Sequence, residues 1–386
     1  MKQLTRLFIP ICLETLFYML SGMVDTLMLS AVGDYAVGAV GTANSYIGIF
    51  IIMFSIISSG MVSVMTQNIG AGRPGVAYQA RQLGLLFNAV AGVLMAVFLF
   101  SGAGAILRMV GIADALYEPA LIYLKIVGGG CILNAVIPIF SSYLRAFGYT
   151  KQPLYATIVG NIANFVMNAV FLFVLHKGVA GVATATVISK ILNLCIVLYF
   201  SHKLISAKNS TERIANKTVL GQIVKVGLPS ACETALYNVA MMLVIRFLNQ
   251  MDAEGLNVTA RSYTATISNF SYCVGAALAQ ANAIMTGWHI GAGELEECDR
   301  GTKRAAFVGV CVAVCMETAI VLGSGFIMPL FTDNPEMTAL VRKLLAIDIV
   351  LEIGRVTNLV FGQALKTSGD AVFPAVIAAV FMFVFA

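Results

Sequence analysis

Charged residues are scarce in this chain of 386 residues. Asp, Glu, Lys and Arg make up only 11% of it, whereas hydrophobic residues make up 59%. A water-soluble domain of this length would carry far more charge on its surface. Runs of about 18 or more residues with few charges recur along the whole chain, and such runs are typical of helices that cross a membrane. The composition therefore predicts an all-α, polytopic membrane protein embedded in a lipid bilayer.

Residues that build metal centres and active sites are also few or poorly spaced. The chain has 3 histidines, and its 8 cysteines lie mostly inside apolar runs, without the spacing of metal ligands. Membrane helices accept cysteine as a small apolar residue, so we expect no disulfide framework, no metal centre and no cofactor. The sequence shows no nucleophile–base pair, and it therefore does not predict an enzyme.

The basic residues are distributed unevenly along the chain. If the N-terminus is cytoplasmic, 14 Lys and Arg residues fall in segments on the cytoplasmic side, while acids outnumber bases in the outer loops. This pattern follows the positive-inside rule, and it accounts for most of the net charge of +5 without a nucleic-acid partner. The predicted orientation therefore places the N-terminus in the cytoplasm.

The apolar runs predict eleven membrane helices separated by turn sequences, such as Gly-Ala-Gly-Arg-Pro-Gly at 70–75 and Ser-Gly-Asp at 368–370. The predicted ranges are 7–31, 38–66, 83–107, 118–145, 154–175, 179–202, 222–249, 259–288, 304–331, 338–366 and a last helix from about 371.

The sequence contains an internal repeat. PICLETLFY (10–18) aligns with PSACETALY (229–237). IGAGR (69–73) aligns with IGAGE (290–294), and LRAFGYTKQPLYA (144–156) aligns with LKTSGDAVFPAVI (365–377), at a common offset that nearly equals that of the first match. A duplicated unit of six helices enters the membrane the same way in both copies. The two copies are then related by an axis along the membrane normal, as in known transporters.

The repeat predicts two lobes joined by a polar linker. The expected domains are an N-terminal six-helix lobe at 1–202, a cytoplasmic linker at 203–221 and a C-terminal lobe at 222–386. Ala386 aligns with Phe165, which lies inside the fifth helix of the first copy. We therefore expect an incomplete second repeat, with about 11 of 12 helices present and without the end of helix 11 and helix 12.

Several short motifs occur in a fixed order. The first lobe contains V-D-T-x-M (24–28), G-A-G-R (70–73), L-R-A-x-G-x-T-x-x-P (144–153) and G-V-A-G-V-A-T-A-T (178–186). The second lobe contains L-E-I-G-R-x-x-N (351–358) and G-D-x-x-F-P (369–374). The ordered set covers the whole chain and resembles bacterial members of the multidrug and toxic compound extrusion (MATE) family.

The resemblance implies a monomeric secondary antiporter of the bacterial inner membrane, with two lobes facing a central cavity. Such proteins export organic cations or other amphipathic drugs in exchange for protons or sodium ions. An alternative is a flippase for a lipid-linked precursor, from the same superfamily, which predicts a wider and more basic cavity. A receptor or assembly subunit that transports nothing would not need buried acids in both lobes.

Asp25 is the only charged residue in the stretch SGMVDTLMLS (21–30). Ionisable groups are costly inside a membrane, and the resemblance assigns the coupling-ion role to this aspartate. A carboxyl group in a low-dielectric site, with no strong cation nearby, can exchange a proton with its surroundings. The predicted cation-coupling site of the N-terminal lobe comprises Asp25, Asn134, Asn161, Asn164 and Asn168. The alternative for the four amides is a structural role in joining helices.

A second polar site is expected in the C-terminal lobe. It comprises Glu233 in the seventh helix and Asp348, Glu352 and Arg355 in the tenth helix. Glu352 and Arg355 are spaced to pair on adjacent turns, which would leave Asp348 or Glu233 less neutralised. The resemblance implies a cation site in these two helices, and sodium is the metal that it would hold. The alternative is a structural ion pair between Glu352 and Arg355.

Three further residues are candidates for the wall of the central cavity: Glu14, Tyr18 and Tyr237. Aromatic rings at such positions suit flat organic cations. Glu14 and its repeat mate Glu233 either attract cations or pair with bases near the inner surface, such as Arg6 and Lys225. Lys190 lies deep in the sixth helix, and the sequence does not identify its partner.

Overall fold

The computed structural model describes residues 2–109, 111–205, 212–251, 256–332 and 334–384, and these residues form helices joined by short turns. The first half of the chain contains α1 (Lys2–Ser30), α2 (Asp34–Gly70), α3 (Pro74–Met109), α4 (Asp114–Gly129), α5 (Cys131–Ala146), α6 (Lys151–Ala169) and α7 (Gly178–Leu204). The second half contains α8 (Asn216–Met251), α9 (Leu256–Ala292), α10 (Leu295–Ile327), α11 (Pro335–Ser368) and α12 (Val372–Val384). A π-helical turn at Val170–Val174 and a 3₁₀ turn at Met328–Leu330 extend α6 and α10.

The predicted membrane class agrees with the helix lengths. Within the described ranges, seven helices are long and apolar enough to cross a membrane, and the bent pair α4–α5 can form an eighth span. The helices α9 and α11 are as long but are not among these seven, and they carry many of the polar side chains discussed below. The described part of α12 is a short apolar helix.

The predicted helix at 118–145 is wrong in one respect, because the chain bends by 42° between α4 and α5. The break falls at Gly130, the last of three consecutive glycines. Glycine is a poor helix former, so interrupting a helix at these glycines costs less stability than interrupting it at other residues. A Cβ at Gly130 would lie 3.1 Å from Val187 Cγ2, so the bend also brings the chain close to α7.

Other predicted helix boundaries also differ from the structure, most at the starts of three helices. Helix α3 begins at Pro74 rather than at 83. Helix α8 begins at Asn216, inside the linker predicted at 203–221, and α10 begins at Leu295 rather than at 304. The starts of α8 and α10 carry polar and charged residues. A hydropathy pattern leaves such residues out of a membrane segment, although they form regular helix. Residues 206–211 of the predicted linker lie outside the described residues.

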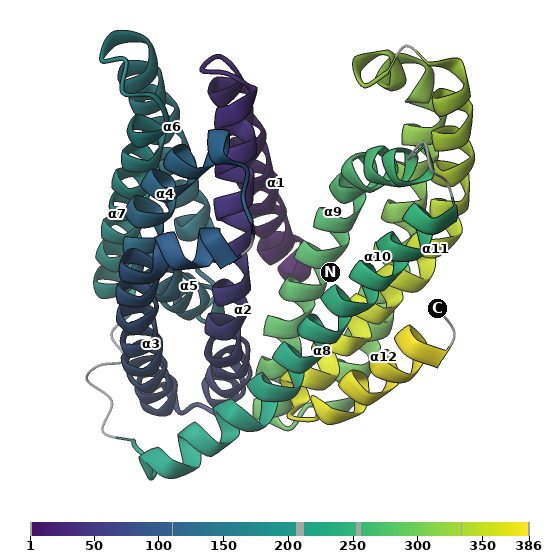
Figure 1. Ribbon diagram of the computed structural model, residues 1–386. Coiled ribbons are helices and arrows are strands. Elements are labelled where there is room, and N and C mark those ends of the chain that lie inside the picture. The colour runs from purple at the N-terminus through teal and green to yellow at the C-terminus, as the bar shows by residue number, and fades with distance from the viewer. Residues whose placement is uncertain (1, 110, 206–211, 252–255, 333, 385–386) are drawn as a thin grey trace.

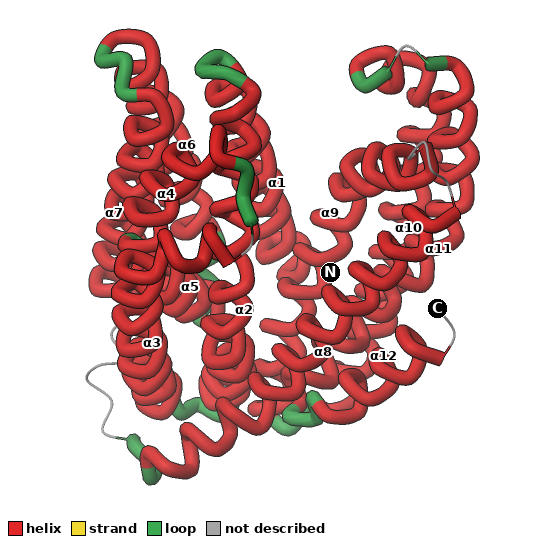
Figure 2. The backbone as a smooth tube through the Cα atoms, viewed as in Figure 1, coloured by secondary structure: helices red, strands yellow, loops and turns green. Residues whose placement is uncertain are grey.

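The helices form two arms, α1–α7 and α8–α12 (Figure 1). The arms meet at the end of the molecule that holds the α2–α3 turn and the start of α8, and they diverge towards the opposite end (Figure 2). Helix α8 starts beneath the first arm and crosses to the second. The predicted duplication therefore has a counterpart in space, as two helical arms joined at one end.

The arms are joined because the first helix of each lobe packs against the second helix of the other lobe. On α1, Leu4, Leu7 and Ile11 are buried in a cluster with Ala277, Ala281 and Ile284 of α9. On α8, Val219 and Ile223 are buried in a cluster with Met61, Val64 and Met65 of α2. Burial of these apolar side chains stabilises the closed end of the molecule.

Candidate functional sites in the two lobes

The polar site of the N-terminal lobe is built from α1 and α6. Asn168 donates a hydrogen bond from Nδ2 to Asp25 Oδ1 at 2.7 Å and another to Asn164 Oδ1 at 3.1 Å. Asn161, one turn further along the same face, donates to the Phe17 carbonyl at 2.9 Å. The +3 and +4 spacing places the three amides on one face of α6, as the sequence predicts, and two of them, Asn161 and Asn168, bond to α1. Asp25 is held by a neutral amide, which is wholly buried.

Asn134, the fourth amide of the predicted coupling site, is bonded to Lys190 and has no hydrogen bond to Asp25 among the described residues. Lys190 Nζ of α7 donates to Asn134 Oδ1 of α5 at 2.8 Å. The buried Nδ2 atom of Asn134 has no hydrogen-bond partner among the described residues. Lys190 lies near enough to Asp25 for its charge to act there, contrary to the expectation that no cation is nearby, but the two side chains form no ion pair among the described residues. The carboxyl group of Asp25 therefore has a neutral amide as its hydrogen-bond partner and an ammonium group in its neighbourhood.

The polar site of the C-terminal lobe has one arginine and three acids. Arg355 Nη1 donates to Glu352 Oε2 at 2.6 Å, which confirms the predicted pair. Arg355 Nη2 also reaches Asp348 Oδ1 at 3.2 Å, so Asp348 shares this base with Glu352 at a longer distance, and its buried Oδ2 atom has no hydrogen-bond partner among the described residues. Ser271 of α9 donates a further hydrogen bond to Glu352 Oε1 at 3.2 Å.

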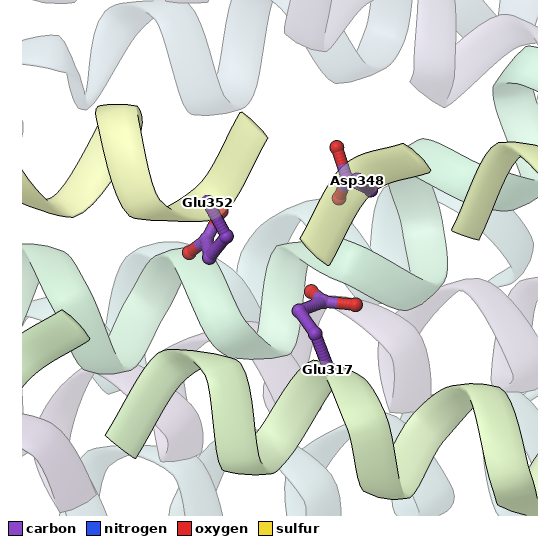
Figure 3. A group of neighbouring side chains, drawn as sticks. All are labelled: Glu317, Asp348 and Glu352. Atoms are coloured by element: carbon purple, nitrogen blue, oxygen red, sulfur yellow. The ribbon is translucent and has the colours of Figure 1, made fainter. Parts of the chain in front are cut away.

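The third acid, Glu317 of α10, is a functional candidate that the sequence reading missed. Glu317 points from its helix towards Asp348 and Glu352 of α11 (Figure 3). One oxygen of each carboxylate lies within 4.8 Å of the other two. Glu317 is fully buried, and neither of its oxygens has a hydrogen-bond partner among the described residues. The signal in the sequence was a lone acid in the apolar run VCMETAIVL (314–322).

This acidic cluster, Glu317, Asp348 and Glu352 with Arg355, can hold a cation. Three carboxylates and one guanidinium leave two negative charges if every group is ionised. Carboxylate oxygens are ligands for hard cations such as Na⁺, and buried charges persist only when they are compensated. Uptake of protons or of a metal cation would supply that compensation.

Glu233 does not belong to the acidic cluster, contrary to the prediction. It pairs with Lys366 of α11 at 2.8 Å. Its repeat mate Glu14 pairs with Arg145 of α5 at 2.6 Å, rather than with Arg6 or Lys225. Arg145 and Lys366 are themselves repeat mates, since they align in the third match of the internal repeat. The two ion pairs are therefore a duplicated structural feature.

The remaining cavity candidates are Tyr18 and Tyr237, which are also repeat mates. Their side chains are 71% and 49% exposed. Both tyrosines lie one helical turn beyond the glutamate of the duplicated ion pair, on α1 and α8. They remain available to a ligand, whereas Glu14 is neutralised by Arg145.

Known proteins resemble this chain over nearly its whole length. The sequence pattern of the MatE family matches residues 10–170 and 229–386, one segment in each lobe. A relative from Bacillus subtilis (strain 168), described as "Uncharacterized transporter YisQ", is 32% identical over 379 residues, which is 97% of this chain and 83% of that protein.

Solved structures of transporters share the fold. The crystal structure of an aspartate-to-asparagine mutant of the Vibrio cholerae MATE transporter VcmN gives a TM-score of 0.88 at 18% identity, over 100% of this chain and 87% of that one. An outward-facing multidrug resistance MATE family transporter of the MOP superfamily gives 0.86 at 19% identity, over 99% and 86% of the two chains. This chain therefore belongs to the MatE family of multi-pass membrane transporters, which are not enzymes.

Proposed function

We propose that this protein is a secondary antiporter of the bacterial inner membrane that exports organic cations or other amphipathic compounds in exchange for protons or sodium ions. The observation that carries the proposal is Glu317, a fully buried acid without a hydrogen-bond partner among the described residues, beside two further acids. A buried cluster with excess negative charge favours a state in which a cation is bound. A transporter uses such a group to couple ion flow to movement.

The mechanism requires only that the ion and the substrate prefer different arrangements of the two lobes. Asp25 is the proposed switch of the N-terminal lobe because it bonds across the α1–α6 interface through Asn168. A proton on Asp25 changes that hydrogen bond, and with it the packing of α1. The acidic cluster lies between α10 and α11, so a cation there changes the packing of the second lobe.

The proposed substrates follow from charge and shape. The exposed Tyr18 and Tyr237 offer aromatic faces at equivalent positions of the two lobes. Flat organic cations bind such faces through cation–π contacts. The similarity to a structure described as a multidrug resistance transporter supports this substrate class.

A lipid-linked anion is the second candidate substrate, and a specific observation favours it. Glu14 and Glu233 are both paired with bases, and Lys190 adds a positive charge in the first lobe. The interior is therefore less acidic than the count of acids in the sequence predicts. A flippase for a lipid-linked precursor would release these bases from their present partners to bind the phosphate of its substrate.

The test is efflux of ethidium from proteoliposomes that contain the full chain. A pH gradient and a sodium gradient are imposed separately on the wild type, Asp25→Asn and Glu317→Gln. The matched control is Glu336→Gln, which changes an exposed acid of α11. We expect gradient-driven efflux in the wild type and the control, and its loss in Asp25→Asn. Absence of ethidium efflux under either gradient, from folded protein, would move the proposal to the lipid-precursor flippase.

A further inference from the structure

Two hydrogen bonds between the lobes occupy equivalent positions of the repeat. Gln67 Nε2 at the end of α2 donates to the Thr367 carbonyl of α11 at 2.5 Å. Trp288 Nε1 near the end of α9 donates to the Ala146 carbonyl of α5 at 2.9 Å. At the common offset of the second and third repeat matches, Gln67 aligns with Trp288 and Ala146 aligns with Thr367. Each lobe therefore donates a side-chain N–H to the main chain of the other.

The two acceptor carbonyls are left free by the way their helices end. In α5, the carbonyls of Leu144 and Arg145 accept main-chain bonds from Tyr149 and Gly148. In α11, the carbonyls of Leu365 and Lys366 accept the equivalent bonds from Asp370 and Gly369.

Both helix ends turn through a glycine with a left-handed backbone, Gly148 at φ 83° and Gly369 at φ 101°. This turn satisfies the neighbouring carbonyls within its own lobe. The carbonyl of the next residue, Ala146 or Thr367, is left for a donor from the other lobe. Ser63 Oγ of α2 also donates to the Thr367 carbonyl, at 2.8 Å, so α2 holds that turn twice.

The donor helices are held against each other by a duplicated glycine. A Cβ at Gly70 of α2 would overlap the Trp288 carbonyl, and a Cβ at Gly291 of α9 would overlap the Gln67 carbonyl. Gly70 and Gly291 are repeat mates within the two IGAG motifs. Only glycine permits this approach, so the motif has a packing role at the point where α2 and α9 cross.

The duplicated ion pairs support the same acceptor turns. Arg145 directly precedes the acceptor Ala146, and Lys366 directly precedes the acceptor Thr367. Their partners, Glu14 on α1 and Glu233 on α8, tie each acceptor turn to the first helix of its own lobe. Arg145 also donates to Gln280 of α9 at 3.2 Å, so one of these pairs reaches across to the other lobe.

We propose that Gln67–Thr367 and Trp288–Ala146 form an interlobe latch that keeps one end of the transporter closed. The latch lies at the end where the two arms meet, beside the α2–α3 turn (Figure 1). This inference rests on the proposed function, since the lobes must separate at this end for a substrate to enter. Both donors, Gln67 and Trp288, are positioning residues, which act on the equilibrium between the open and closed states and not on the ion or the substrate.

The chemistry of the latch suits reversible opening. Each bond joins a neutral side chain to a main-chain carbonyl, so breaking it leaves no buried charge. Loss of one such bond changes an equilibrium by only about fivefold. Because the two bonds are repeat mates, we expect their removal to shift the equilibrium in the same direction.

The test uses two latch variants that remove only the donors. Trp288→Phe keeps an aromatic ring. The other variant combines Gln67→Met, which keeps the length of the side chain, with Ser63→Ala, because Ser63 donates to the same carbonyl. The control Gln82→Met changes an exposed glutamine of α3 in the same lobe.

The readout is the distance between the lobes at the latched end. Spin labels at the exposed positions of Arg73 and Glu296 report it, in full-length protein in lipid nanodiscs. We expect Trp288→Phe, which removes one donor, to raise the ratio of long to short label distances about fivefold, and the double variant, which removes two donors, to raise it by more than that, while the control matches the wild type.

Native fluorescence provides a second readout, because Trp288 is the only tryptophan of the chain. Its indole ring is held against the Ala146 carbonyl while the latch is closed. Acrylamide should therefore quench it more strongly in the variant that carries Gln67→Met than in the wild type.

Unchanged label distances in both latch variants would overturn the latch, even where ethidium efflux is normal. Longer distances in both variants, together with no efflux from the wild type, would support the latch and overturn the proposed antiport. The distance measurement thus separates failure of this inference from failure of the proposed function.

Discussion

The interiors of the two lobes differ from each other more than do the two copies of the contacts that join the lobes. In the first lobe, Asp25 is bonded to a neutral amide, and Lys190 is the cation in its neighbourhood. In the second lobe, three acids share one arginine. The repeat mates of Glu317, Asp348 and Glu352 are Ala96, Val127 and Cys131, which carry no charge. By contrast, the ion pairs, the helix-end glycines and the crossing glycines occur in both copies. Duplication therefore preserved the framework, while the chemistry inside each lobe diverged.

The largest effect should come from removing the single base of the acidic cluster. Arg355→Met leaves three buried acids without a compensating charge, whereas Lys190→Met breaks a hydrogen bond to the neutral amide of Asn134 and removes the cation near one carboxyl group, that of Asp25. We expect a loss of about 3–5 kcal/mol for Arg355→Met and about 1–3 kcal/mol for Lys190→Met. Thermal unfolding in detergent measures both. Equal losses of stability in the two variants would contradict the difference in charge that we infer between the two lobes.

The second largest difference between the two lobes should appear in cation binding. We expect Glu317→Gln to weaken sodium binding at least about tenfold in titration calorimetry, since it removes one of three ligand carboxylates. Asp25→Asn should leave sodium affinity unchanged, because Asp25 is a single carboxyl group bonded to the amide of Asn168 and lies outside the group of three carboxylates. A loss of sodium affinity in Asp25→Asn alone would place the metal site in the first lobe instead.

The duplicated ion pairs should respond alike. Glu14→Gln and Glu233→Gln each leave one base unpaired in a mostly buried position, with the side chains of the pairs 12–20% exposed. We expect each to reduce the free energy of unfolding by about 1–3 kcal/mol, with the larger effect for the less exposed Glu14. The exchanged pair Glu14→Arg with Arg145→Glu should recover part of the loss. A double variant no more stable than the single variants would argue against a direct pair.

The smallest expected effect is that of Asn161→Ala. This amide donates to the Phe17 carbonyl and contacts no ionisable group in the hydrogen bonds of the described residues. We expect a loss of about 0.5–1.5 kcal/mol in stability with ion coupling unchanged. Asn168→Ala is the comparison, because it also removes the bond to Asp25 and should reduce proton-driven ethidium efflux. If both variants keep full efflux, Asn168 has only the structural role.

Local patterns in the sequence predicted local structure correctly. The spacing of Asn161, Asn164 and Asn168 predicted one helix face, and the spacing of Glu352 and Arg355 predicted their ion pair. Both predictions depend only on the 3.6-residue period of a helix. Long-range partners were predicted poorly, since nothing in the sequence joins Arg145 to Glu14 or Lys190 to Asn134. Glu233 was assigned to the wrong cluster for the same reason.

The sequence by itself determined the membrane class, the duplication and the approximate positions of the helices. Hydrophobic runs, repeat offsets and turn residues are properties of consecutive residues, and they are visible without a fold. Only the tertiary structure decided which polar groups meet, because helix packing sets the neighbours of a buried side chain. Glu317 became a candidate when α10 and α11 placed it beside Asp348 and Glu352, and the latch became visible when Gln67 and Trp288 were each found facing a carbonyl of the other lobe.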